Sequence, residues 1–356
     1  MRRALRWLFG VFLLGLLALF GADYLVWRWA GGMIGESYAG WRAAREAEGW
    51  VVESGAAHLT GWPFAARLVV PDFALKRGAG AAPGGVSLTL PELDLAVALT
   101  APGDLLITPV GTARATLGGL PPLAIAAASA ALHTRLTASD AAPLAGEARQ
   151  VTLRPDQTPK DAASGFVLTI DRVDFLLSTP AAPPSLTLHL QAGGIDLPTA
   201  ISWPFGAHIG RAALDAGLTP LPVVAADANY VATKAAWRAA QGSLRLAATL
   251  TNWGGATMSG EAKLDLDDKL APQGVGLLHL IDPDTAVASV ARQGLITDSS
   301  AQALGAVLRL LAHPAENDPA GGGKPEVDLP LSYTDGLVSA GGIPLFRLSR
   351  AGMGVP

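Results

Sequence analysis

The strongest structural signal in the chain is the stretch SLRLAATLTNWGGATMSGEAKLDLD, residues 243–267. Leu244 and Leu246 alternate with polar side chains, and the alternation resumes after residues 252–255 and continues to Leu266. A period of two residues places successive side chains on opposite faces of a strand, and a Gly-rich turn between two such runs is typical of a hairpin. The stretch therefore predicts an antiparallel hairpin with one apolar and one solvent-facing side.

Most of the chain shows the same alternation of apolar and polar residues. Short alternating runs are separated by 41 glycines and 26 prolines, residue types that favour turns. Helical periodicity returns at 284–312 and predicts a short helical pair near the C-terminus. We predict a mainly β fold, either a long curved antiparallel sheet or a β-sandwich, behind an N-terminal transmembrane helix. Further strands are expected at 86–90, 93–99, 105–110, 113–117, 166–177, 186–190, 274–281, 327–334 and 337–340.

The N-terminus has the pattern of a single-pass membrane anchor. Basic side chains precede an uncharged run that, continued to residue 29, forms a helix of about 34 Å, close to the thickness of a hydrocarbon core. Tryptophans fit the interfaces, and the basic end is expected to stay in the cytoplasm while the bulk is exported. A cleaved signal peptide and a buried core helix are the alternatives. The expected anchor residues are Arg2, Arg3, Arg6, Trp7, Trp27 and Trp29.

A four-residue echo suggests two similar halves. Gly61-Trp62-Pro63-Phe64 recurs as Ser202-Trp203-Pro204-Phe205, 141 residues later. The aromatic side chains could form a ligand-contacting corner in each half, or could be structural plugs at a sheet edge. We therefore divide the chain into a cytoplasmic tip and anchor (1–35), a helical stalk (36–49), a first β module (50–194) and a second β module (195–356) with the helical pair.

Composition excludes several functions. The formal net charge is −4, which makes a nucleic-acid partner improbable on electrostatic grounds. The chain has no cysteine, which removes disulfides, Cys-based zinc sites and thiol catalysis. Its six histidines form no HExxH or other closely spaced ligand pair, and no GxSxG or GxGxxG motif occurs. The sequence thus predicts no catalytic residues, no metal ligands and no cofactor.

Several short motifs resemble a known bacterial family. Gly49-Trp50 and Gly61–Phe64 follow the anchor, and Leu264–Leu266, Pro272–Gly274 and Gly341–Leu345 follow near the end of the chain. This arrangement resembles the family called domain of unknown function 2125, and it covers most of the chain. The order of strands and helices is also similar, more weakly, to AsmA-like envelope proteins, a resemblance that implies a long β-groove fold and lipid handling. Neither resemblance implies catalytic residues.

Three functions are compatible with these patterns. The first is a periplasmic protein anchored in the bacterial inner membrane that binds a lipid or another apolar ligand along a sheet groove. The second is a non-enzymatic structural or assembly factor of the envelope that acts through protein contacts. The third is an envelope hydrolase, for which the sequence offers no clustered acids or histidines. The expected groove or core residues are Trp62, Phe64, Trp203, Phe205, Leu246, Leu264 and Leu278.

Overall fold

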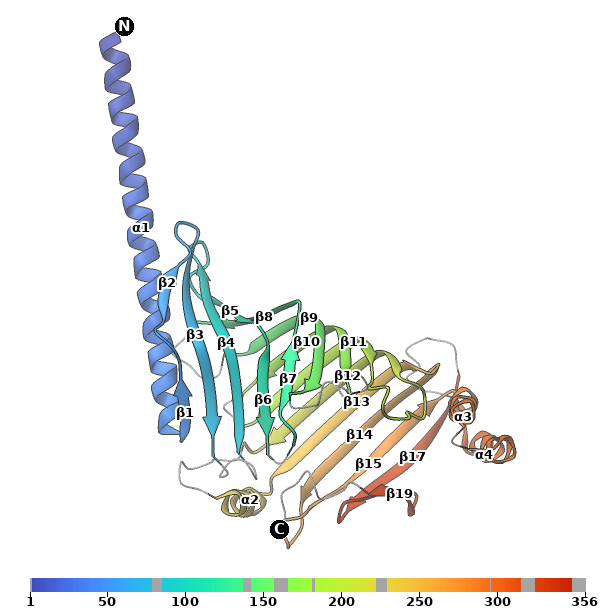
Figure 1. The fold of residues 1–356 in the computed structure, drawn as a ribbon. Coiled ribbons are helices and arrows are strands. Elements are labelled where there is room, and N and C mark those ends of the chain that lie inside the picture. Colours follow the sequence, from blue (N-terminus) through green and yellow to red (C-terminus); the bar gives the residue numbers. More distant parts are fainter. Residues whose placement is uncertain are drawn as a thin grey trace.

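The computed structural model describes residues 2–78, 85–118, 120–136, 142–156, 166–180, 183–221, 229–294, 296–314 and 324–347. Within these ranges, side chains are described from Phe12 to Gly342. One long helix projects from a strongly curved sheet, and three short helices lie at the ends of strands (Figure 1).

The long helix α1 (Arg2–Ala47) is continuous across the expected boundary between anchor and stalk. With 46 residues it is about 69 Å long. Its N-terminal half extends beyond the sheet, whereas its C-terminal half runs alongside β1–β3 (Figure 1). From Phe12 onward it is long and apolar enough to cross a membrane, and its most apolar stretch is not buried against the protein.

All strands belong to one antiparallel sheet, and 52% of the residues are in strands. The mainly β fold class and the long antiparallel sheet are confirmed, and no second sheet forms a sandwich among the described residues. The strands are β1 Trp50–Glu53, β2 His58–Thr60, β3 Ala65–Arg77, β4 Val86–Ala98, β5 Asp104–Val110, β6 Ala113–Leu117, β7 Leu123–Ala126, β8 Ser129–Arg135, β9 Leu144–Pro155, β10 Leu168–Ser178, β11 Leu186–Asp196, β12 His208–Thr219, β13 Ser243–Trp253, β14 Ala256–Leu266, β15 Pro272–Ile281, β16 His313–Pro314, β17 Pro325–Thr334, β18 Leu337–Ala340 and β19 Ile343–Arg347.

The sheet is a meander with one branched region. Strand β4 pairs with β5 along one half and with β6 along the other. The two branches continue through β8 and β7 and rejoin at β9. From β9 to β15 each strand pairs with the next, and β15 then pairs with β17. The expected module boundary at 194/195 falls inside β11, where the sheet continues without interruption.

Two of the predicted strands form one longer strand. The ranges 86–90 and 93–99 are both part of β4, which pairs with β3 over its whole length. The apolar alternation changes phase between Leu90 and Leu93, opposite Asp72, whose φ of 51° lies in the left-handed region. Leu90 and Leu93 nevertheless pack in the same hydrophobic cluster. The local change in backbone conformation therefore keeps apolar side chains on one face.

The predicted helical pair is confirmed as α3 (Pro283–Arg292) and α4 (Asp298–Leu311). A further helix, α2 (Tyr230–Ala239), was not predicted. Each of these three helices begins after a residue whose side-chain oxygen accepts a hydrogen bond from the backbone of the first turn, namely Asn229, Asp282 and Thr297. The two Trp-Pro-Phe motifs lie in the β2–β3 and β11–β12 connections, and the two halves show no matching order of elements.

The main hydrophobic core lies where α1 meets the sheet. Ala30 and Ile34 of α1 are fully buried, as are Val70 and Val97 of β3 and β4. Trp27 of α1 also packs here, and its indole N–H donates a hydrogen bond to the Thr60 carbonyl at 3.2 Å. The C-terminal half of α1 therefore covers the apolar face of the first strands.

Candidate functional site: an apolar trough

The antiparallel register aligns apolar side chains into rows that cross the sheet. One row starts at Leu59 of β2 and passes through Leu68, Leu95, Ile107 and Leu132. It continues from β9 to β17 on the same face. Aligned rows of this kind give the sheet one apolar face along its entire length.

We define the apolar trough as this face between β10 and β17. Its residues, in three rows, are Phe175, Leu190, Leu214, Ala248, Gly260, Leu278 and Leu329; Leu177, Leu188, Ala216, Leu246, Ala262, Gly276 and Leu331; and Leu186, Leu218, Leu244, Leu264, Gly274 and Tyr333.

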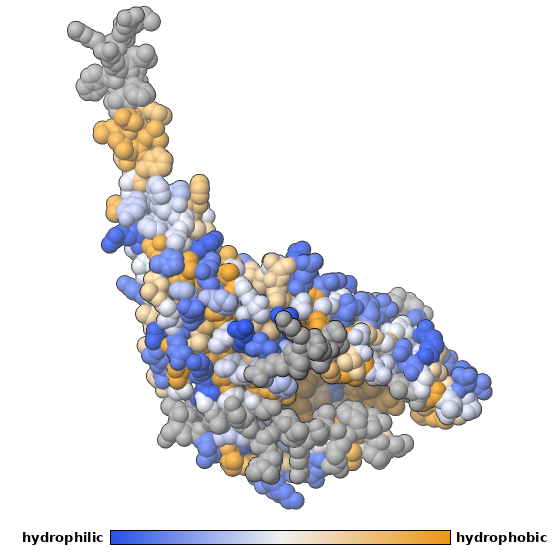
Figure 2. Space-filling view, in the orientation of Figure 1, coloured by the Kyte–Doolittle hydropathy of each residue, from blue (hydrophilic) through white to orange (hydrophobic). Residues whose placement is uncertain are grey.

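The trough is only partly shielded from solvent. Its leucines are half-buried, including Leu246, Leu264 and Leu278, and Ala248 is exposed. Within the described residues, the extensive contacts of β10–β15 are between neighbouring strands, and α2 and α3 add small contacts with β14. The space-filling view shows the body hollowed below the strands, with largely apolar surface inside the hollow (Figure 2). A packed core would bury these leucines almost completely.

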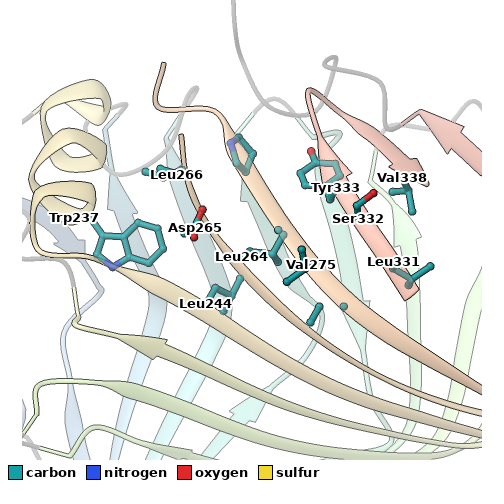
Figure 3. Close-up of a pocket in the computed structure, with 14 residues that line it drawn as sticks. Trp237, Leu244, Leu264, Asp265, Leu266, Val275, Leu331, Ser332, Tyr333 and Val338 are labelled. Atoms are coloured by element: carbon teal, nitrogen blue, oxygen red, sulfur yellow. The ribbon is translucent and has the colours of Figure 1, made fainter. Parts of the chain in front are cut away.

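A pocket of about 450 Å³ lies at one end of the trough, between α2 and the strands β13–β18 (Figure 3). Trp237 of α2 forms one wall, and its indole N–H donates a hydrogen bond to the Pro220 carbonyl at 2.8 Å. Small residues, Ala262, Gly274 and Gly276, lie between the larger apolar side chains. This volume lies within the range of pockets that bind small apolar ligands.

Few polar groups line the pocket. Asp265 and Tyr333 are its titratable residues among those described, and they lie on β14 and β17, with β15 between them (Figure 3). The Asp265 Oδ1 atom is buried and has no hydrogen-bond partner among the described residues. The pocket therefore presents an almost entirely apolar interior.

Comparison with protein families assigns the chain to one family. A family model described as an uncharacterised protein conserved in bacteria, DUF2125, matches residues 27–348. The chain belongs to the DUF2125 family. Comparisons with curated proteins and with solved structures found no match. The family match covers the C-terminal part of α1 and the whole sheet, so it includes every residue of the apolar trough.

The expected groove residues of this DUF2125 chain occupy different environments. Leu246, Leu264 and Leu278 lie in the apolar trough. Trp203 donates its indole N–H to the Pro198 carbonyl at 2.9 Å, and Phe205 packs edge-on against Trp253, both at the end of the sheet where the strands turn. These two aromatic side chains close a sheet end and do not line the pocket.

The first Trp-Pro-Phe motif lies beside α1 of the DUF2125 chain. The Trp62 ring contacts Phe20 and Tyr24 of α1, at centroid distances of 6.3 and 6.5 Å. Phe64 is 86% exposed. This turn therefore adds aromatic surface next to the part of α1 that leaves the sheet.

The expected anchor residues also separate into groups. Trp27 packs against the sheet, as described above, whereas Trp29 is 60% exposed. Arg2, Arg3, Arg6 and Trp7 lie in the first turns of α1, and their side chains are outside the described part of the chain.

The face opposite the trough carries polar pairs within strands and between neighbouring strands. His208 lies 2.8 Å from Asp196, and His189 pairs with Asp215. Arg172 hydrogen-bonds Asp174 and thereby lowers the pKa of that carboxyl, while the pKa of Arg172 is raised by the same contact. These pairs explain why one face of the DUF2125 sheet is solvated.

A denser polar cluster lies at the C-terminal end of the same face. It consists of His279 on β15, Glu326 and Asp328 on β17, and His313 on β16. No close sequence spacing joins the two histidines to the carboxylates. The nearer carboxylate, Glu326, lies 47 residues from His279 and 13 from His313. The sequence signal that could have identified it is the spacing of Glu326 and Asp328, which places both side chains on one face of a strand.

Proposed function

We propose that this protein, anchored in the inner membrane by α1, binds a lipid in the periplasm with the acyl chain lying in the apolar trough. The observation that carries the proposal is a continuous apolar face whose leucines stay half-buried because little of the described chain covers it. Such a face in water is costly, since each square ångström of exposed apolar surface costs about 25 cal/mol. A bound acyl chain would remove that cost.

The dimensions of the trough support an acyl chain as ligand. Strands in a sheet lie about 4.8 Å apart, so the rows from β10 to β17 extend for about 29 Å. The acyl chains of one leaflet fill about half of a hydrocarbon core of about 30 Å, or about 15 Å. The trough is therefore long enough for an extended acyl chain, and its lining of leucine, alanine and glycine provides no competing charge.

The position of the trough relative to α1 supports a source of lipid in the adjacent bilayer. Ala30 and Ile34 are buried against the sheet, so α1 is an integral part of the fold and holds the body at a set distance from its apolar segment. Trp62 and Phe64 add exposed aromatic surface beside Tyr24, a residue type that favours the membrane interface. The same apolar face that starts beneath α1 leads into the trough.

The proposal is a binding function without a chemical step. The pocket residues described include one carboxylate and one phenol, with no histidine or lysine beside them. General acid–base or nucleophilic catalysis needs paired groups within hydrogen-bond reach. An assembly factor that uses the trough for a protein segment is the competing function.

Site-specific photocrosslinking in growing cells tests the proposal. Ala247 and Ala248 are adjacent exposed residues of β13 that face opposite sides of the sheet. A photoreactive phenylalanine analogue at position 248 should yield lipid adducts, detected by mass spectrometry, while the analogue at 247 should not. Because both positions are equally distant from α1, lipid that merely surrounds the anchor does not produce this difference. Adducts to protein alone at 248 would instead favour the assembly factor.

The proposed topology can be tested separately. The chain has no cysteine, so a single Ala247→Cys substitution provides a unique label on the solvated face. A maleimide that crosses the outer membrane but not the inner membrane should label this residue in intact cells. Labelling only after lysis would contradict the periplasmic location.

A further inference from the structure

One cluster on the polar face of the sheet is larger than the simple pairs found elsewhere on that face. Antiparallel register sets His279 directly opposite Asp328, and it sets His313 directly opposite Glu326. Glu326 and Asp328 are two residues apart on β17, so four polar side chains from three adjacent strands converge on one patch.

The side chains of the cluster lie close enough together to share one small metal ion. The Nδ1 atom of His279 lies 3.0 Å from Glu326 Oε1 and 2.7 Å from Asp328 Oδ1, and the Nε2 atom of His313 lies 3.3 Å from Asp328 Oδ2. The ligand atoms of His279, Glu326 and Asp328 all lie within 4.8 Å of one another. Tetrahedral coordination with bonds of about 2.0–2.1 Å places ligand atoms about 3.3 Å apart.

The charge balance of the cluster also favours a cation. Glu326 is only 7% exposed, and neither it nor Asp328 has a lysine or arginine partner among the described residues. The nearby Lys324 pairs with Asp282 at 3.3 Å instead. Two carboxylates this close repel each other, and a divalent cation between them would balance their charge.

The orientation of His313 is that of a metal-binding imidazole. Its Nδ1 lies 3.2 Å from the Pro314 carbonyl, which can only accept a hydrogen bond, so Nδ1 carries the proton. Nε2, the ring atom that faces Asp328, is then the one that can bind a metal, and binding there releases any proton it holds. A backbone carbonyl that holds the second ring nitrogen is the usual support of a histidine ligand.

We propose that His279, His313, Glu326 and Asp328 bind a divalent transition-metal ion. Two imidazoles and two carboxylates suit Zn²⁺ best among such ions, whereas Ca²⁺ and Mg²⁺ prefer all-oxygen sites. Because His313 follows α4 directly, the ion joins the end of that helix to β15 and β17. This inference concerns the face opposite the trough and is independent of the proposed lipid function.

Zinc binding by the full chain in detergent tests this site. The chain should carry an affinity tag without histidine, be stripped with a chelator, be loaded with Zn²⁺ and be desalted before metal analysis. The wild type should retain one ion per chain. His279→Gln and Asp328→Asn should each lower Zn²⁺ affinity by at least about ten-fold.

His189→Gln is the matched control. His189 pairs with Asp215 on the same face, but only one carboxylate contacts it among the described residues, so the variant should bind Zn²⁺ like the wild type. Circular dichroism establishes that each variant is folded, and Co²⁺ in place of Zn²⁺ should give the visible absorption of a tetrahedral site only where the cluster is intact. The proposal is overturned if the wild type retains no Zn²⁺ after it has been stripped, reloaded and desalted. It is also overturned if His189→Gln loses as much Zn²⁺ affinity as His279→Gln.

Discussion

Strands β3 and β4 and strands β13 and β14 have the same alternation of apolar and polar side chains, yet their apolar faces have different surroundings. On β3 and β4, α1 covers the face, and Val70 and Val97 are fully buried. On β13 and β14 the equivalent leucines, Leu246 and Leu264, remain half-buried. The difference shows that a strand with one apolar side needs another element to cover that side. On β13 and β14 the described chain covers little of it.

The largest expected effect distinguishes a covered face from an open one. Val70→Asp places an unpaired carboxylate in a closed core and should lower the free energy of unfolding by about 3–5 kcal/mol. Leu246→Asp leaves the carboxylate in contact with water and should cost about 1–2 kcal/mol. Urea unfolding of the full chain in detergent, followed by circular dichroism, measures both. Equal losses would mean that the trough is a closed core.

A second prediction concerns how tightly α1 fits on the covered face. A Cβ atom at Gly31 would overlap the Leu59 side chain, whereas one at Gly32 has open space around it. Gly31→Val should therefore cost about 1–3 kcal/mol through overpacking. Gly32→Val should be close to neutral, because valine has a better helix propensity than glycine. If both variants unfold at the same urea concentration, α1 does not pack against β2 as described.

A third prediction compares two tryptophans with similar local bonding. Trp237 and Trp203 are both partly buried, and each donates its indole N–H to a proline carbonyl. Replacing either by alanine should lower stability by about 1–3 kcal/mol. Only Trp237→Ala removes a wall of the pocket, so only this variant should weaken binding of a fluorescent fatty acid, by about five-fold for 1 kcal/mol of lost contact. An equal loss of probe affinity in Trp203→Ala would show that the probe does not bind in the pocket.

The smallest expected effect concerns the start of α3. Asp282 caps α3 and pairs with Lys324; burial opposes its ionisation, but hydrogen bonds from Thr285 and the nearby ammonium outweigh burial and lower its pKa. Because the pKa is lower in the folded protein, this contribution to stability is present above the ordinary value of the carboxyl and is lost as pH falls through the folded value. Asp282→Ala should cost about 1 kcal/mol at neutral pH.

Asp282→Asn is the control for this effect. Asparagine also caps helices and tolerates the left-handed backbone of this position, where φ is 58°. This variant should keep most of the stability at neutral pH and lose the acid-dependent part. If Asp282→Asn still loses stability below pH 4 as the wild type does, the pH dependence of stability comes from other carboxyl groups.

Much of the architecture could be predicted from local patterns. The alternation of Leu244, Leu246 and Leu264 placed these residues on one face, because side-chain direction in a strand depends only on parity. The apolar segment of α1 and the helices α3 and α4 were equally visible in the sequence. The helix α2 was missed, and with it the wall that Trp237 contributes to the pocket, although its ten residues are nearly as amphipathic as those of α3.

The long-range features depended on how the strands assemble. Alternation gives each strand an apolar side, but whether a helix, a second sheet or solvent faces that side depends on contacts between residues far apart in the chain, such as Ala30 with the first strands. The same holds for His279 and Asp328, which are 49 residues apart and become neighbours only through the register of β15 and β17. Local propensity is a property of a few consecutive residues, whereas coverage of a face and convergence of side chains are properties of the whole sheet.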